Sequence, residues 1–332
     1  MIAAYKRNKE VILKEKHPRA LNPREIRLKV EACGICGTDL FGEEEDFSPF
    51  GHEVAGEIIE CGCGIDYLRV GQKVVIDSAT PCGRCSSCKD GKQELCEDIQ
   101  SIFYLEEFGF AEEMIAPGES AIPYKELSPS VATLQEPLGV AIDMVRLGEI
   151  NKDSNVLIIG QGPIGLMAAA LVKQANAKRI FISDFKEKSA RIELAMKWGA
   201  DECIDPKDLA AYDFNCLIDR ILVTAPPPTL NQAFNIACKG AIISFIGIGH
   251  GDAAFCRFDA NAFHFKKLQL RASFASPALF GPQALGYLID GTVKGVELIS
   301  HTFSLKQIKD AMDTARESFD ALKVVVVPGG PE

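Results

Sequence analysis

Four cysteines lie close together in one short segment of the 332-residue chain, and their spacing can hold a metal ion. Cys82, Cys85, Cys88 and Cys96 follow the pattern C-x2-C-x2-C-x7-C. Four thiolates can converge on one tetrahedral zinc ion, and a site closed by four protein ligands leaves no position for a substrate. We therefore predict a structural zinc ion in a lobe at about residues 80–100. A disulfide cluster and a redox-active C-x2-C pair are the alternatives.

A second set of residues with metal-binding side chains is spread over three segments. Cys36 and His52 supply a thiolate and an imidazole, and Glu53 and Glu136 are two candidates for a carboxylate ligand. Three such ligands leave one tetrahedral position for water or an alcohol, which is the arrangement of a catalytic zinc ion. Asp39 is a natural hydrogen-bond partner for the ring N–H of His52. The sequence thus predicts a second zinc ion, with the choice between the two glutamates open.

A glycine pattern later in the chain predicts a dinucleotide-binding site. The pattern G-x-G-x-x-G comprises Gly160, Gly162 and Gly165, with Pro163 and Ile164 before the last glycine. It follows the apolar run 156–159 and opens an alanine-rich helix. The three glycines permit a tight turn, a close approach of the backbone to a pyrophosphate, and close helix–strand packing. The N–H groups and dipole of the helix N-terminus then attract the phosphates.

Asp184 supports this interpretation and bears on which nicotinamide cofactor binds. It ends the next apolar run, twenty-four positions after Gly160. A carboxylate at this place accepts hydrogen bonds from the adenosine ribose hydroxyls, and it repels the 2′-phosphate of NADP. We therefore expect NAD rather than NADP. Arg191 is included among the predicted cofactor-binding residues, although it and two nearby lysines would weaken the preference for NAD.

The elements that must position these residues fall into two patterns. Up to about residue 122 the chain reads as short strands interrupted by glycine and proline, including 26–30, 54–59 and 73–76, which predicts an all-β unit. From residue 155, apolar β-branched runs alternate with helical stretches, which is typical of a parallel sheet with crossover helices. The predicted strands of this second part are 156–159, 179–183, 216–218, 241–246 and 268–272. A helix is expected at 189–198, a later helix at 305–316 and a last strand at 323–327.

Composition limits the classes of function. The formal net charge is −10, and the sequence has no basic stripe that would contact a phosphate backbone, so we expect no nucleic-acid partner. The longest apolar run, 156–172, is interrupted by Gln161 and Pro163 and is too short for a membrane span. We expect no membrane partner, a cytoplasmic location and a small-molecule substrate. The acidic run 43–46 predicts a solvated loop.

The motifs together resemble a known family. The zinc-dependent medium-chain dehydrogenases, in particular their sorbitol and threonine dehydrogenase branch, carry the same motifs in the same order: Gly34-Ile-Cys36-Gly-Thr38-Asp39, Gly51-His52-Glu53, the four-cysteine segment, Glu136-Pro137-Leu138 and the G-x-G-x-x-G run. The resemblance implies an α/β plus β fold with three parts. A GroES-like β domain with the zinc lobe is expected at 1–140, a doubly wound Rossmann domain at 141–275, and a segment that partly returns to the first domain at 276–332.

The resemblance also implies an activity. It predicts NAD-linked oxidation of a secondary alcohol to a ketone, with Cys36, His52 and a glutamate on the catalytic zinc ion and Thr38 hydrogen-bonded to the reacting hydroxyl. Polyols, cyclitols, amino sugars and amino alcohols are the expected substrates, and a homotetramer or homodimer is the expected assembly. Phe41 departs from the family, because many relatives carry a proton-relaying histidine there. The alternatives are a non-catalytic NAD-binding sensor or scaffold and a zinc-free reductase of the same fold.

Overall fold

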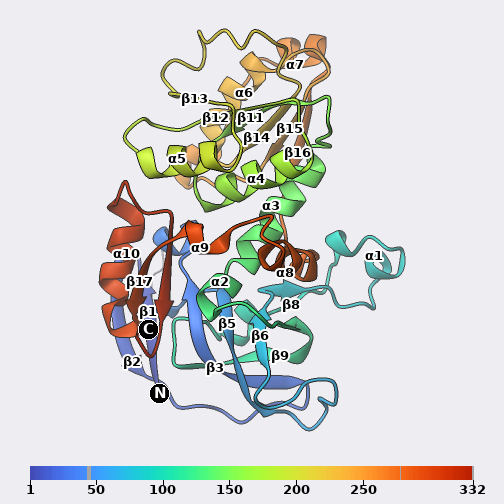
Figure 1. Cartoon of the computed structure of the whole chain (residues 1–332). Coiled ribbons are helices and arrows are strands. Elements are labelled where there is room, and N and C mark those ends of the chain that lie inside the picture. Colours follow the sequence, from blue (N-terminus) through green and yellow to red (C-terminus); the bar gives the residue numbers. More distant parts are fainter. Residues whose placement is uncertain (43–45, 277, 331–332) are drawn as a thin grey trace. The chain divides into compact units, whose positions relative to one another are not determined.

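The chain folds into two compact units, each of which has its own core. The computed structural model describes residues 1–42, 46–276 and 278–330. Unit 1 comprises residues 1–139 and 275–332, and unit 2 comprises residues 140–274 (Figure 1). The helix α3 (Gln135–Leu147) contains the boundary at residue 139. Residues 43–45 of the predicted acidic loop lie outside the described residues.

Unit 1 is built around a mostly antiparallel sheet. Its strands are β3 (Glu25–Gly34), β5 (Glu53–Cys61), β6 (Lys73–Ile76), β9 (Glu113–Pro117), β10 (Ala121–Pro123), β17 (Ile299–Ser304) and β18 (Lys323–Val327). The strand order is β10-β6-β5-β3-β18-β17, with β9 also paired to β3. Apolar side chains of β3 and β5, such as Ile26, Leu28 and Ile58, are completely buried in the core of this unit. The late strands β17 and β18 thus complete a sheet that begins with β3.

Shorter elements surround this sheet. The remaining strands of unit 1 are β1 (Ile2–Arg7), β2 (Glu10–Glu15), β4 (Ser48–Pro49), β7 (Ala79–Thr80) and β8 (Gln100–Ser101). Its helices are α1 (Ser86–Lys89), α2 (Pro129–Ala132), α8 (Gly281–Ile289), α9 (Gly295–Leu298) and α10 (Ile308–Glu317). The helix α1 and the strand β8 belong to the segment that projects from the sheet in Figure 1 and carries the four cysteines.

Unit 2 is a parallel sheet in the order β13-β12-β11-β14-β15-β16. Its strands are β11 (Asn155–Ile159), β12 (Arg179–Ser183), β13 (Glu202–Ile204), β14 (Arg220–Val223), β15 (Ile242–Phe245) and β16 (Gln269–Ala272). Its further helices are α4 (Pro163–Gln174), α5 (Ser189–Lys197), α6 (Leu230–Ile236) and α7 (Ala260–Lys266). Counted along the chain, this order is 3-2-1-4-5-6, which is that of a dinucleotide-binding doubly wound sheet.

One predicted strand of unit 2 was wrong. A strand was predicted at 216–218, but β14, the fourth strand of unit 2 along the chain, begins at Arg220. The pairing of β14 with β11 begins at Arg220, and the backbone carbonyl of Leu217 instead accepts a hydrogen bond from the Asn155 side-chain amide at 2.9 Å. The Leu217 side chain is 72% exposed, unlike those of the buried sheet strands. A short apolar run therefore preceded the real strand and was mistaken for it.

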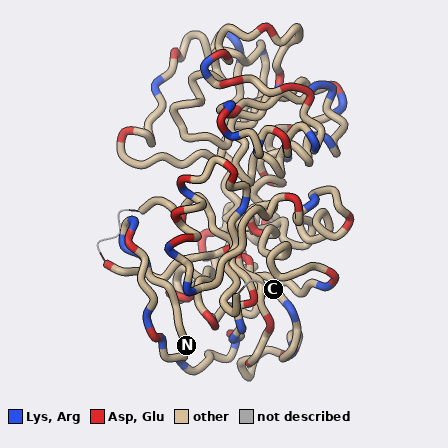
Figure 2. The backbone as a smooth tube through the Cα atoms, turned by 60° about the vertical axis from the view of Figure 1, so that its left-hand side comes forward, with Lys and Arg blue, Asp and Glu red and all other residues tan. Residues whose placement is uncertain are grey.

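Charged side chains of both signs are dispersed along the described chain, as Figure 2 shows. The dispersal holds in both units, and acidic residues outnumber basic ones by 46 to 36 over the whole sequence. None of the described helices is long and apolar enough to cross a membrane.

Candidate functional site

The pairing of β3 with β5 brings the first predicted ligands together. Gly34, the last residue of β3, is the register partner of Glu53, the first residue of β5. Cys36 follows just beyond the end of β3, and His52 directly precedes β5. Consequently one ligand atom each of Cys36, His52 and Glu53 lies within 4.8 Å of the other two. Residues sixteen positions apart in the sequence thus meet at one end of a strand pair.

Asp39 lies beside two residues of this cluster, with a hydrogen bond to one and a longer charged contact with the other. It lies in the 3-10 helix Gly37–Leu40, and its Oδ2 accepts a hydrogen bond from the backbone N–H of Cys36 at 2.9 Å. Its Oδ1 lies 3.7 Å from Nδ1 of His52. Burial lowers the pKa of His52, but the charge of Asp39 and the contact with Cys36 outweigh burial and raise the pKa well above its usual value. A metal ion binding at this imidazole has to displace its proton.

Glu136 lies beside the cluster rather than in it. It is the second residue of α3, and its Oε1 accepts a hydrogen bond from the Ser78 hydroxyl at 3.4 Å. Burial raises the pKa of Glu136 to about 7, with the His52 charge opposing this rise and the Glu53 charge adding to it. Among the described residues, the ligand-type group at this place contains Glu53 and not Glu136. The structure therefore brings both candidate carboxylates near His52 but places only Glu53 within the cluster.

Lys323 is a residue of this site that the sequence analysis missed. Its Nζ forms an ion pair with Oε2 of Glu53 and donates a hydrogen bond to the carbonyl oxygen of Ile35 at 2.8 Å. Burial lowers the pKa of Lys323, but the negative charges of Glu53 and Cys36 outweigh burial and raise it. The signal in the sequence was a lysine at the start of a strand whose other residues are all valine, where a charged residue needs a partner.

The donor set fits a zinc ion. Thiolate, imidazole and carboxylate are the ligands that zinc takes in proteins, and three of them leave one coordination position open. Thr38 lies two residues from Cys36, and its side chain is exposed. Phe41 is 58% exposed, and its ring has no ionisable group. The open position and the adjacent hydroxyl are the two features that a reacting alcohol requires.

The four-cysteine segment forms a second cluster within unit 1. The four sulfur atoms all lie within 4.8 Å of one another, and Sγ of Cys85 lies 3.9 Å from Sγ of Cys96. Zinc–sulfur bonds of about 2.3 Å in a tetrahedron place sulfurs about 3.8 Å apart, so this spacing fits the ion. All twelve cysteines of the chain are free, so the structure provides no support for the disulfide alternative.

Backbone N–H groups point at the sulfurs of this cluster. Those of Cys85 and Cys88 donate to the sulfurs of Cys82 and Cys85 at 3.4 and 3.5 Å. The hydrogen bond from Cys88 is the main cause that lowers the pKa of Cys85 to about 6. Burial instead raises the pKa of Cys88 to about 12. Zinc binds thiolates, so these N–H groups favour the metal-binding form of Cys82 and Cys85, whereas Cys88 has to lose its proton when the ion binds.

The predicted glycine loop lies between β11 and α4 in unit 2. Gly160 has a φ of 95°, and a side chain on Gly165 would collide with the carbonyl of Gly160. Gly162 is the N-cap of α4 and has open space where a side chain would be. Pro163 and Ile164 are the first two residues of that helix. Two glycines thus serve close packing, and the third leaves room for a ligand at the helix N-terminus.

Asp184 directly follows β12 and lies against this loop. Its Oδ2 accepts a hydrogen bond from the backbone N–H of Gln161 at 3.1 Å, and its Oδ1 lies 3.6 Å from Nζ of Lys188. Burial lowers the pKa of Arg191, and the charge of Asp184 partly offsets this effect. The structure therefore brings the predicted ribose-binding carboxylate next to the phosphate loop, with basic side chains around it.

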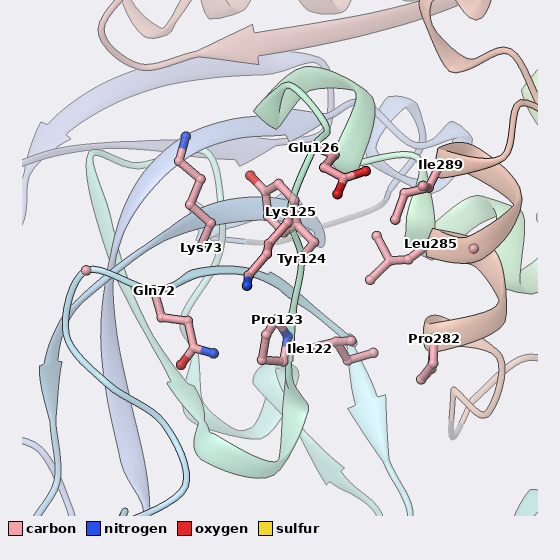
Figure 3. A pocket seen from close by; sticks show the side chains of 12 residues that line it. Gln72, Lys73, Ile122, Pro123, Tyr124, Lys125, Glu126, Pro282, Leu285 and Ile289 are labelled. Atoms are coloured by element: carbon pink, nitrogen blue, oxygen red, sulfur yellow. The ribbon is translucent and has the colours of Figure 1, made fainter.

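A cavity of about 740 Å³ lies elsewhere in unit 1 (Figure 3). Ile122, Pro123 and Leu285 line it, together with the polar side chains of Gln72 and Lys73. None of the candidate zinc ligands lines this cavity. The cavity is therefore separate from the candidate zinc ligands.

Fold and site together define a dinucleotide-dependent dehydrogenase with a GroES-like domain. The family model described as "Alcohol dehydrogenase GroES-like domain" matches residues 22–126, and the model described as "Zinc-binding dehydrogenase" matches residues 163–283. The chain belongs to the zinc-dependent medium-chain dehydrogenases, as its motifs predicted. The α/β plus β fold with GroES-like and Rossmann parts is confirmed as well.

Individual relatives support this assignment. An L-threonine 3-dehydrogenase of Pyrococcus abyssi is 34% identical over 69% of this chain and 70% of its own. A sorbitol dehydrogenase of Bacillus subtilis is 29% identical over 93% and 91%. The solved structure of the alcohol dehydrogenase RspB from E. coli CFT073, in complex with NADH, has a TM-score of 0.87 at 26% identity and covers 98% of this chain and 99% of that one. These relatives do not favour the sensor or scaffold alternative.

Proposed function

We propose that this protein oxidises a secondary alcohol to a ketone, with NAD as the hydride acceptor and with one catalytic and one structural zinc ion per chain. The convergence of Cys36, His52 and Glu53 within 4.8 Å carries the proposal, because their side chains provide three zinc ligands and leave one position for a hydroxyl. The zinc-binding family and the NADH-bound structural relative support the two kinds of cofactor. Zinc supplies Lewis acidity that makes a hydroxyl easier to deprotonate, and the nicotinamide takes up hydride.

The residues around the open coordination position have different roles. Cys36, His52 and Glu53 bind the ion, and Asp39 holds the Cys36 backbone and the His52 ring in place. Glu136 provides a second carboxylate at the edge of the site. Thr38 accepts the proton of the substrate hydroxyl and passes it on. Because Thr38 is exposed, it can release this proton to solvent, and the Phe41 ring, which has no ionisable group, takes no part in the transfer.

The substrate class is tested with a panel of sugar alcohols, cyclitols, amino sugars and amino alcohols. Each compound is mixed with the zinc-loaded protein and NAD, and NADH is followed by its absorbance. At least one compound with a secondary hydroxyl next to a second polar group should give NADH, and the Cys36→Ala variant should give none with the same compound. Absence of turnover across the panel in zinc-replete protein would contradict the proposal. The names of the sorbitol and threonine relatives support polyols and amino alcohols as the first choices.

The preference for NAD is proposed to depend on Asp184. In Asp184→Ala, the loss of charged hydrogen bonds to the ribose hydroxyls should lower kcat/KM for NAD roughly tenfold to a hundredfold, while kcat/KM for NADP stays unchanged or rises. Initial rates with both cofactors measure this change. Asp313→Ala is the matched control, since Asp313 is 47% exposed, pairs with Arg316 and belongs to unit 1. Equal losses for NAD and NADP would indicate that Asp184 only supports the loop through Gln161.

A cytoplasmic location and a homodimeric or homotetrameric assembly are proposed by analogy with the family. Size-exclusion chromatography with light scattering measures the assembly directly. A monomer at micromolar concentration would contradict this part of the proposal.

A further inference from the structure

The ion pair between Lys323 and Glu53 is almost completely buried. The side chains are 2% and 1% exposed, respectively. The Lys323 ammonium also donates to the carbonyl of Ile35, so it faces two acceptors inside the protein. Replacing a buried ion pair by apolar residues often leaves a fold as stable or more stable, so such a pair is weak evidence for a stabilising role. Its position at a candidate metal ligand suggests another role.

The sheet fixes Lys323 at this place. Lys323 is the first residue of β18, and β18 pairs with the end of β3, where Val325 lies opposite Gly34. A side chain on Gly34 would collide with the Glu53 carboxylate and would lie 3.0 Å from Cε of Lys323. The absence of a side chain at Gly34 therefore leaves the space in which the ammonium and the carboxylate meet. The Glu53 carboxylate thus faces the ligand atoms of Cys36 and His52 as well as the ammonium of Lys323.

We propose that Lys323 is a positioning residue for the catalytic zinc ion. Its ammonium holds one carboxylate oxygen of Glu53, so that the zinc ion binds the other oxygen, and its charge keeps Glu53 a weak ligand. The inference rests on the proposed function and deepens it. Partners of a metal ligand set both its orientation and its basicity, and an anionic partner raises the basicity. A cationic partner has the opposite effect, because it competes with the metal for the same carboxylate charge. A weaker carboxylate donates less charge, so the zinc ion stays more electrophilic toward the substrate hydroxyl.

The sign of this effect separates the proposal from a merely structural role. In Lys323→Met, a neutral side chain of similar length replaces the cation. The proposal expects the dissociation constant for zinc at this site to fall by about tenfold or more, and kcat to fall by about tenfold, because Glu53 then binds the ion more strongly. In the cobalt-substituted protein, the visible absorption bands of the site should shift. If Lys323 only supported the fold, its loss would loosen the site and weaken zinc binding.

The experiment measures zinc affinity by chelator competition on the full-length protein. The Cys36→Ala variant keeps only the four-cysteine site, so the zinc that it binds is subtracted from that of the other variants. The same measurements are made on Glu53→Gln and on Glu53→Gln/Lys323→Met, and the effect of removing Lys323 should disappear when Glu53 is neutral. Lys16→Met is the matched control, because it removes a lysine paired with Glu107 and should leave zinc affinity unchanged. If Lys323→Met does not fold, Lys323→Gln keeps a donor toward Ile35 and carries the same expectations.

Three results would overturn the inference. The first two are an unchanged or weaker zinc affinity in folded Lys323→Met and an unchanged cobalt spectrum in that variant. The third is that removing Lys323 changes zinc affinity equally in the wild-type and Glu53→Gln backgrounds. Wild-type protein that binds no metal at Cys36 would instead refute the proposed function itself. The two failures are therefore distinguishable.

Discussion

Replacing Cys36 or His52 with alanine should lower turnover by at least about a thousandfold. Several kcal/mol of charge stabilisation come from a Lewis-acidic ion, and each 1.36 kcal/mol corresponds to about a factor of ten in rate. NADH should still bind with nearly wild-type affinity, because the glycine loop and Asp184 belong to unit 2 and neither substituted residue does. Initial rates measure turnover, and quenching of protein fluorescence measures NADH binding.

Cys33→Ala is the matched control for the Cys36 variant. Cys33 lies three residues earlier in β3, is completely buried and is absent from the metal-ligand cluster. It should cost about 1–2 kcal/mol of stability through a small cavity and leave zinc content and kcat near those of the wild type. Substantial turnover in both Cys36→Ala and His52→Ala would show that the reaction does not need the ion at this cluster.

Cys88→Ser should change stability and zinc content. A four-thiolate site contributes folding free energy, so the variant should lose one of two zinc ions per chain, as measured by elemental analysis. A loss of about 3 kcal/mol would lower the unfolding midpoint by roughly 6–12 °C for a domain of this size. Any fall in kcat should equal the fraction of protein that is unfolded, because the coordination position for the substrate belongs to the cluster of Cys36, His52 and Glu53.

Cys63→Ser provides the comparison for Cys88→Ser. Cys63 is exposed and lies outside both sulfur-containing clusters, so zinc content and unfolding midpoint should remain unchanged. A wild-type count of one zinc ion, together with an unaltered midpoint in Cys88→Ser, would eliminate the structural site.

Local patterns of residue type were sufficient to predict most of the fold. The strand at 323–327 was predicted with the bounds that the structure shows, because four consecutive valines follow one lysine. Strand β13 (Glu202–Ile204) was missed, since three residues are too few to show a period. The error at 216–218 had another cause, because this apolar run ends two residues before the strand that begins at Arg220.

Some residues of the candidate site could likewise be predicted from local motifs, and others could not. Cys36, His52 and the four lobe cysteines were found because their side chains bind metals at spacings that repeat in short motifs. The choice between Glu53 and Glu136 could not be made from the sequence, since it depends on the pairing of Gly34 with Glu53. Lys323 was missed because it lies 288 positions from Ile35, and only the sheet brings the two together.

The place of β18 in the first sheet has a consequence for biosynthesis. Unit 2 is one continuous stretch, so its internal contacts can form while the ribosome is still adding residues. The neighbour that β3 needs on one side, and the cation opposite Glu53, are synthesised only after the whole of unit 2. Unit 2 of a nascent polypeptide can therefore fold while unit 1 is still incomplete. Premature termination after unit 2 would yield a protein that binds dinucleotide but lacks a complete zinc centre.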